Sequence, residues 1–434
     1  MAAAHVAFRR YHMNNTFLIG ASTAAHQVEG NNTSSDFWVM ENLKHSDFVE
    51  PSGSCCDHYN RFEEDILLLK KAGCNAYRFG IEWARIEPKE GKFCPKAILH
   101  YRSVLQFCHD NGITPLVTLH HFSSPAWLIS KGGWGKEYVV GAFARYVHKV
   151  MEELGDLTPY VCTINEANMG YQINAVARDM MKANKKKEGG IQVGQNMDLN
   201  IKAILLGMFE KGFAFKCSPF GVNTFLNPRS LEKEKIVMAA HQAAVKEIRA
   251  LRPEIKVGLT LSLFDYQVAE GGEAKASALW QEDFGFYLPY FKDDDFLGVQ
   301  NYSRKIVDAE GTREPASGAP LTQMGYEDYP AGIGHVLQKV AKEFKGDLIV
   351  TENGIGTDND QRRCEFIREA FAGVMAAKEA GVPVKGYLHW SLLDNFEWQA
   401  GFSKTFGLIA VDRKTQIRYP KDSLAVLGSL KMEG

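Results

Sequence analysis

Short apolar runs alternate with longer segments of helical periodicity from residue 17 to the end of the chain. The runs are rich in valine, isoleucine, leucine and phenylalanine, which is typical of buried parallel strands. They predict eight strands, at residues 17–22, 75–79, 113–119, 160–164, 256–261, 296–300, 347–351 and 385–390. Apolar residues at helical spacing predict helices at residues 61–72, 97–110, 138–154 and 231–251.

The alternation of strands and helices predicts repeated βα units. Eight such units, with no linker between two halves, favour an α/β fold with a single closed (β/α)8 TIM barrel over two domains. We expect one barrel domain over residues 13–434, with an excursion above it at residues 171–235, where the periodicity is lost. Residues 1–12 are basic and irregular, and we interpret them as a leader segment outside the fold.

The charge balance narrows the class of partner. The formal net charge of −2 gives no reason to expect nucleic acid or an anionic membrane as a partner. No apolar stretch approaches the length of a membrane span, and no signal peptide is visible. The eight cysteines match no zinc motif, so we expect reduced thiols in a cytoplasmic protein that needs no metal or organic cofactor.

Chemically active side chains stand where the predicted strands end, and that edge of a (β/α)8 barrel carries the active site. Two of the strands run into a glutamate, Glu166 after residues 160–164 and Glu352 after residues 347–351. A carboxylate at the mouth of a buried strand is costly unless it is solvated, paired or used. The other strand ends contribute amides, an imidazole, an arginine, a phenol, a carboxylate and indoles: Gln27, Arg78, His121, Asn165, Gln300, Tyr302, Trp390, Glu397 and Trp398.

Such a rim suits a sugar, because amides and carboxylates bind hydroxyls and tryptophan stacks on the apolar face of a pyranose ring. Two glutamates at one site suit glycosidic cleavage, in which one acts as acid and the other as nucleophile or base. Taken singly, a strand-end glutamate is more often a salt-bridge partner. His121 alone would be a hydrogen-bonded core histidine, and Trp390 or Trp398 alone would be a packing residue. Their joint occurrence at the strand ends of one barrel reverses these interpretations.

Five stretches of the chain resemble the glycoside hydrolase family 1 β-glycosidases, and the similarity extends over nearly the whole chain from Phe17 onward. They are AHQVEG at 25–30, YRFGIEW at 77–83, TINE at 163–166, TENG at 351–354 and WSLLDNFEW at 390–398. The resemblance implies a retaining mechanism in which Glu352 is the nucleophile and Glu166 the general acid/base. The two carboxyl groups should then lie roughly 5–5.5 Å apart.

The resemblance also implies roles for the surrounding residues. Arg78 should hold the pKa of Glu352 down, and the charge of Glu352 should raise the pKa of Glu166. Tyr302 should contact the nucleophile, and the anionic Glu397 argues against 6-phosphosugars. The implied sugar-binding set comprises Gln27, His121, Asn165 and Glu397, with Trp390 as stacking platform and Trp398 beside it.

The expected substrate is a small β-glycoside or short oligosaccharide that ends in a non-reducing β-D-glucosyl residue. β-Galactosyl and β-fucosyl groups stay open, as does the oligomeric state. A transglycosylase of the same fold and an inactive sugar-binding protein are the alternative functions, although the presence of both glutamates disfavours the second. The chain departs from the family pattern at Ala167, Gln300 and Asn301, so the leaving-group side cannot be transferred from relatives.

Overall fold

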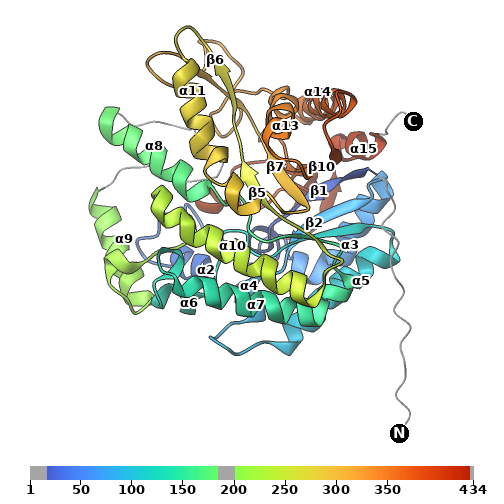
Figure 1. Ribbon diagram of the computed structural model, residues 1–434. Helices are drawn as coiled ribbons and strands as arrows, with labels where there is room; N and C mark the ends of the chain where they lie inside the picture. Colours follow the sequence, from blue (N-terminus) through green and yellow to red (C-terminus); the bar gives the residue numbers. More distant parts are fainter. Residues whose placement is uncertain (1–16, 184–200, 431–434) are drawn as a thin grey trace.

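The computed structural model describes residues 17–183 and 201–430, in which eight parallel strands close into a barrel (Figure 1). The strand order around the barrel is β1-β10-β9-β7-β5-β4-β3-β2. The strands are β1 (Leu18–Ser22), β2 (Ala76–Gly80), β3 (Thr114–Thr118), β4 (Tyr160–Cys162), β5 (Lys256–Ser262), β7 (Phe296–Gln300), β9 (Asp347–Glu352) and β10 (Val384–Trp390). The predicted TIM barrel and its eight strands are thus confirmed, whereas the predicted leader at residues 1–12 lies outside the described residues.

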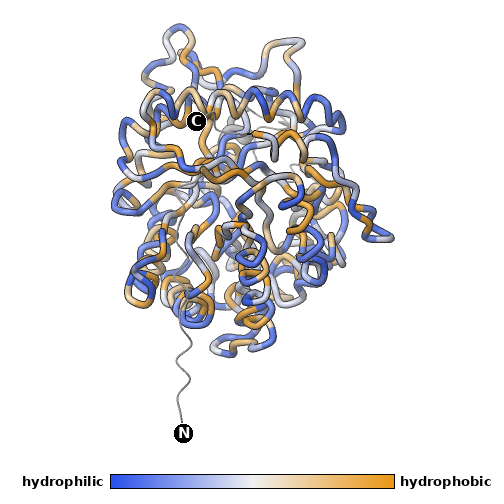
Figure 2. Tube along the Cα trace, turned by 90° about the vertical axis from the view of Figure 1, so that its right-hand side faces the viewer, coloured by the Kyte–Doolittle hydropathy of each residue, from blue (hydrophilic) through white to orange (hydrophobic). Residues whose placement is uncertain are grey.

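Helices surround the barrel, and they bury one face against it while the opposite face meets solvent. The main helices are α3 (His58–Ala72), α5 (Pro95–Asp110), α7 (Tyr138–Leu154), α8 (Met169–Ala183), α9 (Ile201–Ala214), α10 (Leu231–Leu251), α11 (Glu273–Trp280), α13 (Gly332–Glu343), α14 (Asp360–Glu379) and α15 (Asp422–Ser429). Single turns are α1 (Ala25–Val28), α2 (Asp36–Glu41), α4 (Trp83–Ile86), α6 (Ala126–Ser130) and α12 (Leu288–Phe291). Figure 2 shows the resulting mixture of hydrophobic and hydrophilic residues along the helices. The four predicted helices correspond to α3, α5, α7 and α10.

The barrel interior is layered, because alternate residues of a strand point to the same side. A lower layer takes one apolar residue from each of seven strands: Leu18, Ala76, Leu116, Cys162, Phe296, Ile349 and Leu388. Two residues further along β2, β3 and β10 stand Arg78, Thr118 and Trp390. The apolar layer therefore closes the floor of the barrel, and polar chemistry begins directly above it.

The excursion predicted at residues 171–235 contains most of α8 and all of α9, and both helices are seen at the left of the molecule in Figure 1. Helix α9 was not predicted because apolar residues lie on most of its faces, so its sequence lacks the helical periodicity of an amphipathic helix. A second addition, a parallel pair of β6 (Asp265–Val268) and β8 (Arg304–Val307), continues the chain beyond β5 and β7. An antiparallel pair, β11 (Ile409–Val411) and β12 (Arg418–Pro420), follows β10.

No helix within residues 17–183 and 201–430 is both long and apolar enough to cross a membrane.

A buried ion pair joins the two ends of the barrel domain. Asp65 of α3 accepts hydrogen bonds from Arg418 Nε at 2.8 Å and Nη2 at 3.0 Å, and lies 2.7 Å from His58 Nδ1. Burial raises the pKa of Asp65, but the hydrogen bonds from His58 and Arg418 outweigh it and leave the pKa below its usual value. We expect Asp65→Ala to lower the free energy of unfolding by about 3–5 kcal/mol, because it leaves the Arg418 guanidinium buried without a counter-charge.

The pH dependence of this effect has a definite sign. Because the folded pKa is depressed, the stabilisation is complete above the unfolded-state pKa of about 3.9 and is lost as the pH falls through the lower folded value. Urea unfolding should therefore show a constant gap between wild type and Asp65→Ala at neutral pH, which narrows below about pH 4. Glu64→Gln, on the same helix in an exposed pair with Arg61, is the control and should cost under about 0.5 kcal/mol. Equal losses in the two variants would contradict the argument.

Candidate active site

Glu352 is the final residue of β9, and donors from other strand ends hold its carboxylate. Arg78 Nη1 donates to its Oε1 at 2.5 Å, and Tyr302 Oη donates to its Oε2 at 2.7 Å. Arg78 is fully buried on β2, and Tyr302 is the second residue after β7. The two oxygens of this carboxylate are thus fixed from opposite sides of the barrel, and the predicted neighbours of Glu352 are brought together.

Arg78 also fixes Asn165, a member of the predicted sugar-binding set. Arg78 Nη2 donates to Asn165 Oδ1 at 2.6 Å, and Gln300 Nε2 donates to the same oxygen at 2.8 Å. These donors identify Oδ1 as the acceptor, so the Asn165 Nδ2 amide is the donating group. The hydroxyl of Thr260 adds a third hydrogen bond to Oδ1 at 3.0 Å. The orientation of the Asn165 amide is therefore determined by the protein alone.

Glu166 follows Asn165 with a left-handed backbone, at φ 41°. Non-glycine residues rarely adopt this conformation, and it persists only where the surroundings enforce it. The enforcing contacts come from β5: Glu166 N donates to Thr260 Oγ1 at 2.8 Å, and Ala167 N donates to the Thr260 carbonyl at 3.0 Å. Because of this turn the chain leaves β4 sharply, and Glu166 is buried among the strand ends.

The main cause of the pKa shifts of Glu166 and Glu352 differs from the one expected from the sequence. Burial is the largest influence on both, and it raises both pKa values. Arg78 and Tyr302 lower the pKa of Glu352, as predicted for Arg78, but they do not bring it below its usual value, which corrects that prediction. The pKa of Glu166 lies well above normal through burial first and the charge of Glu352 second. Glu166 is therefore the carboxyl of the pair that keeps its proton to higher pH.

A second polar group lies between α1 and the loop after β10. Gln27 Nε2 is 2.9 Å from the Phe396 carbonyl, 3.2 Å from Asn395 Oδ1 and 3.3 Å from Glu397 Oε2. Gln27 Oε1 is buried and has no partner among the described residues. Gln27 and Glu397, both predicted from the sequence to bind the sugar, thus contact each other. Gln27 Oε1 remains available as an acceptor for a ligand.

Aromatic rings line a wall beside these groups. The His121 ring lies nearly parallel to the rings of Trp390, at a centroid distance of 5.6 Å, and Trp398, at 6.0 Å. Burial, Arg78 and His120 keep the pKa of His121 well below normal, so its imidazole is neutral. Its Nε2 accepts from Asn165 Nδ2 at 3.1 Å, which puts the proton on Nδ1, a buried atom without a partner in the described chain. His121 therefore offers one hydrogen-bond donor to a ligand.

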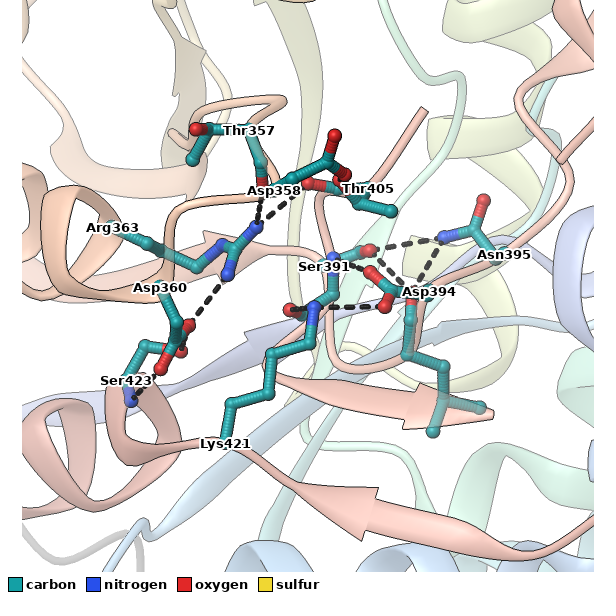
Figure 3. Close-up of polar contacts among 12 residues, drawn as sticks. Thr357, Asp358, Asp360, Arg363, Ser391, Asp394, Asn395, Thr405, Lys421 and Ser423 are labelled. Carbon is teal, nitrogen blue, oxygen red and sulfur yellow. Dashed lines mark hydrogen bonds and ion pairs between the residues drawn. The ribbon is translucent and has the colours of Figure 1, made fainter. Parts of the chain in front are cut away.

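A half-buried ion pair and a buried amide hold the loop that continues from Asn395 to Glu397 and Trp398. Figure 3 shows the contacts of Asp394 and Asn395. Lys421 Nζ forms an ion pair with Asp394 Oδ2 at 2.8 Å, and Asn395 Nδ2 donates a hydrogen bond to Ser391 Oγ at 3.0 Å. Lys421 comes from the segment before α15, far from the loop in sequence. The loop is consequently fixed by the last part of the chain, independently of any ligand.

Thr260 and Thr118 contact the site residues but were not predicted from the sequence. Thr260 bonds both the Glu166 backbone and the Asn165 side chain, and Thr118 Oγ1 accepts from Arg78 Nε at 2.9 Å. The only sequence signal for these two residues is a threonine in an otherwise apolar strand. The alternation of side chains along the strand places that threonine on the inner face of the barrel. Threonine is common in buried strands, so that signal alone has little specificity.

A (β/α)8 barrel with two buried carboxyls of unequal pKa, a fixed arginine and a stacked aromatic wall at its strand ends has the architecture of a glycoside hydrolase. The sequence agrees: the chain belongs to glycosyl hydrolase family 1, whose profile matches residues 10–186 and 292–432. The unmatched residues 187–291 include much of the stretch 171–235, in which the sequence loses its helical periodicity.

Individual relatives match over nearly the full length. The chain is 32% identical to beta-glucosidase A of Thermotoga maritima, with 94% of this chain and 95% of that protein covered. It is 27% identical to a 6-phospho-beta-galactosidase of Clostridium acetobutylicum, with 95% and 96% covered. The solved structure of beta-glycosidase BGL167 superposes with a TM-score of 0.85 at 38% identity, with 96% of both chains covered.

Proposed function

We propose that this family 1 hydrolase is a retaining exo-β-glycosidase that removes terminal β-D-glucosyl residues through a covalent glycosyl-enzyme. The observation that carries the proposal is that two buried carboxyl groups, those of Glu352 and Glu166, have different charged and hydrogen-bonding neighbours. Glu352 is paired with Arg78 at 2.5 Å and bonded by Tyr302, whereas Glu166 has no ion pair among the described residues. An ionised nucleophile beside a protonated acid is the starting state that double displacement requires.

In the first step, one oxygen of the Glu352 carboxylate attacks the anomeric carbon. The bond from that carbon to the glycosidic oxygen breaks, and the leaving oxygen takes the proton of Glu166. The products are a glycosyl ester on Glu352, the free alcohol and an ionised Glu166. Arg78 and Tyr302 keep the Glu352 oxygens oriented before the attack.

In the second step, water attacks the same carbon. Glu166 takes one proton from the water, the ester bond breaks, and the Glu352 carboxylate is restored. Esterification has meanwhile removed the negative charge of Glu352, which is one of the causes that raise the pKa of Glu166. Glu166 therefore becomes a stronger acid at the stage at which it must serve as a base.

The sugar-binding roles follow from the polar atoms and aromatic rings gathered at the strand ends. We assign hydroxyl recognition to Gln27 Oε1, His121 Nδ1, Asn165 Nδ2 and the Glu397 carboxylate, with Trp390 stacking on the ring and Trp398 beside it. The anionic Glu397 supports an unphosphorylated sugar, even though one relative is named a 6-phospho-beta-galactosidase, because a carboxylate would repel a phosphate. The beta-glucosidase name of the Thermotoga relative supports glucose, and the eight free cysteines support a reducing, cytoplasmic setting.

The stereochemistry of the first product tests the proposal. We expect proton NMR of an aryl β-glucoside digest to show the β-anomer of glucose first, because two displacements at one carbon restore its configuration. Mutarotation of pure β-glucose in the same buffer gives the reference rate. An initial α-anomer would show a single displacement and overturn the double-displacement mechanism. The same aglycone on galactose, fucose and xylose then ranks the sugars.

A further inference from the structure

Strand β5 presents two buried hydroxyls toward the Glu166 turn. Thr260 and Ser262 are two residues apart, so both point to the same side of the strand, and neither has any exposed surface. Thr260 holds the backbone of residues 166 and 167, as described above. The Ser262 hydroxyl donates a hydrogen bond to the Glu166 carboxyl group.

The backbone of Ser262 is itself fixed by the segment that follows Glu166. Ser262 N donates to Asn168 Oδ1 at 3.1 Å, and Asn168 Nδ2 donates back to the Ser262 carbonyl at 2.7 Å. Gln172 Nε2 donates to the same carbonyl at 2.9 Å. Three hydrogen bonds therefore fix the backbone of Ser262 relative to the segment that follows Glu166.

We propose that Ser262 is a positioning residue for Glu166 and serves above all the step in which Glu166 accepts a proton from water. The inference rests on the proposed role of Glu166 as general acid/base and adds a residue to it. A hydroxyl donor stabilises a carboxylate more than a neutral carboxylic acid, so it favours the ionised form. Burial and Glu352 favour the protonated form, and Ser262 limits their effect, which keeps Glu166 usable as a base.

Several other charged or titratable groups act on Glu166. They are Glu352 of β9, Arg78 of β2, Glu397 after β10, and the buried tyrosines Tyr302 and Tyr326. Burial raises the pKa of Asp283 to about 6. Its backbone carbonyl accepts a hydrogen bond from Asn168 Nδ2, the same amide that bonds the Ser262 carbonyl. Substitution of Ser262 leaves all of these groups in place. A change in the titration of Glu166 in such a variant is therefore attributable to the lost hydroxyl.

The test compares Ser262→Ala with Ser262→Thr in the full-length enzyme. Rapid-mixing kinetics with 2,4-dinitrophenyl β-glucoside separate formation of the glycosyl-enzyme from its hydrolysis. We expect Ser262→Ala to slow the second step about tenfold, the value of a hydrogen bond to a charged group, with the largest loss at acidic pH. The alkaline limb of kcat/KM should move to higher pH, and Ser262→Thr should restore both features because it keeps a hydroxyl.

The matched control is Ser423→Ala. Ser423 is also a fully buried serine whose hydroxyl donates to a carboxylate, Asp360 Oδ1 at 2.6 Å, but it lies on α15 in the outer helix ring (Figure 3). This variant should leave both pH limbs unchanged. Equal slowing of both steps by Ser262→Ala, unchanged pH limbs, or no restoration by threonine would overturn the role of Ser262. Undiminished hydrolysis of poor leaving groups by Glu166→Ala would instead overturn the proposed function of Glu166.

Discussion

Glu352→Ala is expected to reduce hydrolysis of an aryl β-glucoside by roughly 10⁴-fold or more, because no other group can form the covalent intermediate. The groups that contact its carboxylate cannot replace it: Arg78 and Tyr302 are donors to it and cannot act as nucleophiles at neutral pH. The loss should appear equally with good and poor leaving groups, since attack on the anomeric carbon is common to both. Steady-state kinetics of the purified variant provide the measurement.

The control for this variant is Glu87→Ala, which also removes a buried glutamate paired with an arginine, here Arg145 at 2.7 Å. Glu87 follows α4, outside the strand ends, so its loss should lower thermal stability and leave turnover of the folded enzyme largely intact. Added azide should enter the space vacated by Glu352 and yield the α-glucosyl azide. Wild-type turnover by Glu352→Ala would disprove its assignment as nucleophile.

Glu166→Ala is expected to lose activity in proportion to the need of the leaving group for a proton. With a poor leaving group kcat/KM should fall about 10³-fold, within the usual contribution of general acid catalysis. With 2,4-dinitrophenyl β-glucoside kcat/KM should stay within about tenfold of wild type, because that phenolate departs without protonation. The glycosyl-enzyme should then accumulate, since no base activates water, and mass spectrometry of the quenched protein detects it.

Azide distinguishes this variant from the previous one. It needs no general base, so it should attack the accumulated glycosyl-enzyme of Glu166→Ala and release the β-glucosyl azide, the opposite anomer to that from Glu352→Ala. Glu166→Gln keeps the size of the side chain and should show the same dependence on the leaving group. A uniform loss with all leaving groups, without rescue by azide, would contradict the role of Glu166 as acid/base.

Local pattern was sufficient to predict the barrel. Buried parallel strands read as apolar runs, and helices α3, α5, α7 and α10 kept a clear periodicity, so each element was visible within its own residues. The elements that were missed lacked such a pattern. Helix α9 is apolar on most faces, and β6 and β8 have four residues each, too few to establish alternation.

The sequence by itself determined which residues stand at the strand ends, because the carboxyl end of every barrel strand opens on the same face. It could therefore name Glu166, Glu352 and Arg78 as members of one site. Only the tertiary structure decided how they interact. The pairing of Arg78 with both Glu352 and Asn165, and of β5 hydroxyls with Glu166, depends on barrel closure and strand register, which join residues far apart in the chain. Burial depends on every surrounding atom, which is why it, rather than a single neighbour, dominates the pKa of both glutamates.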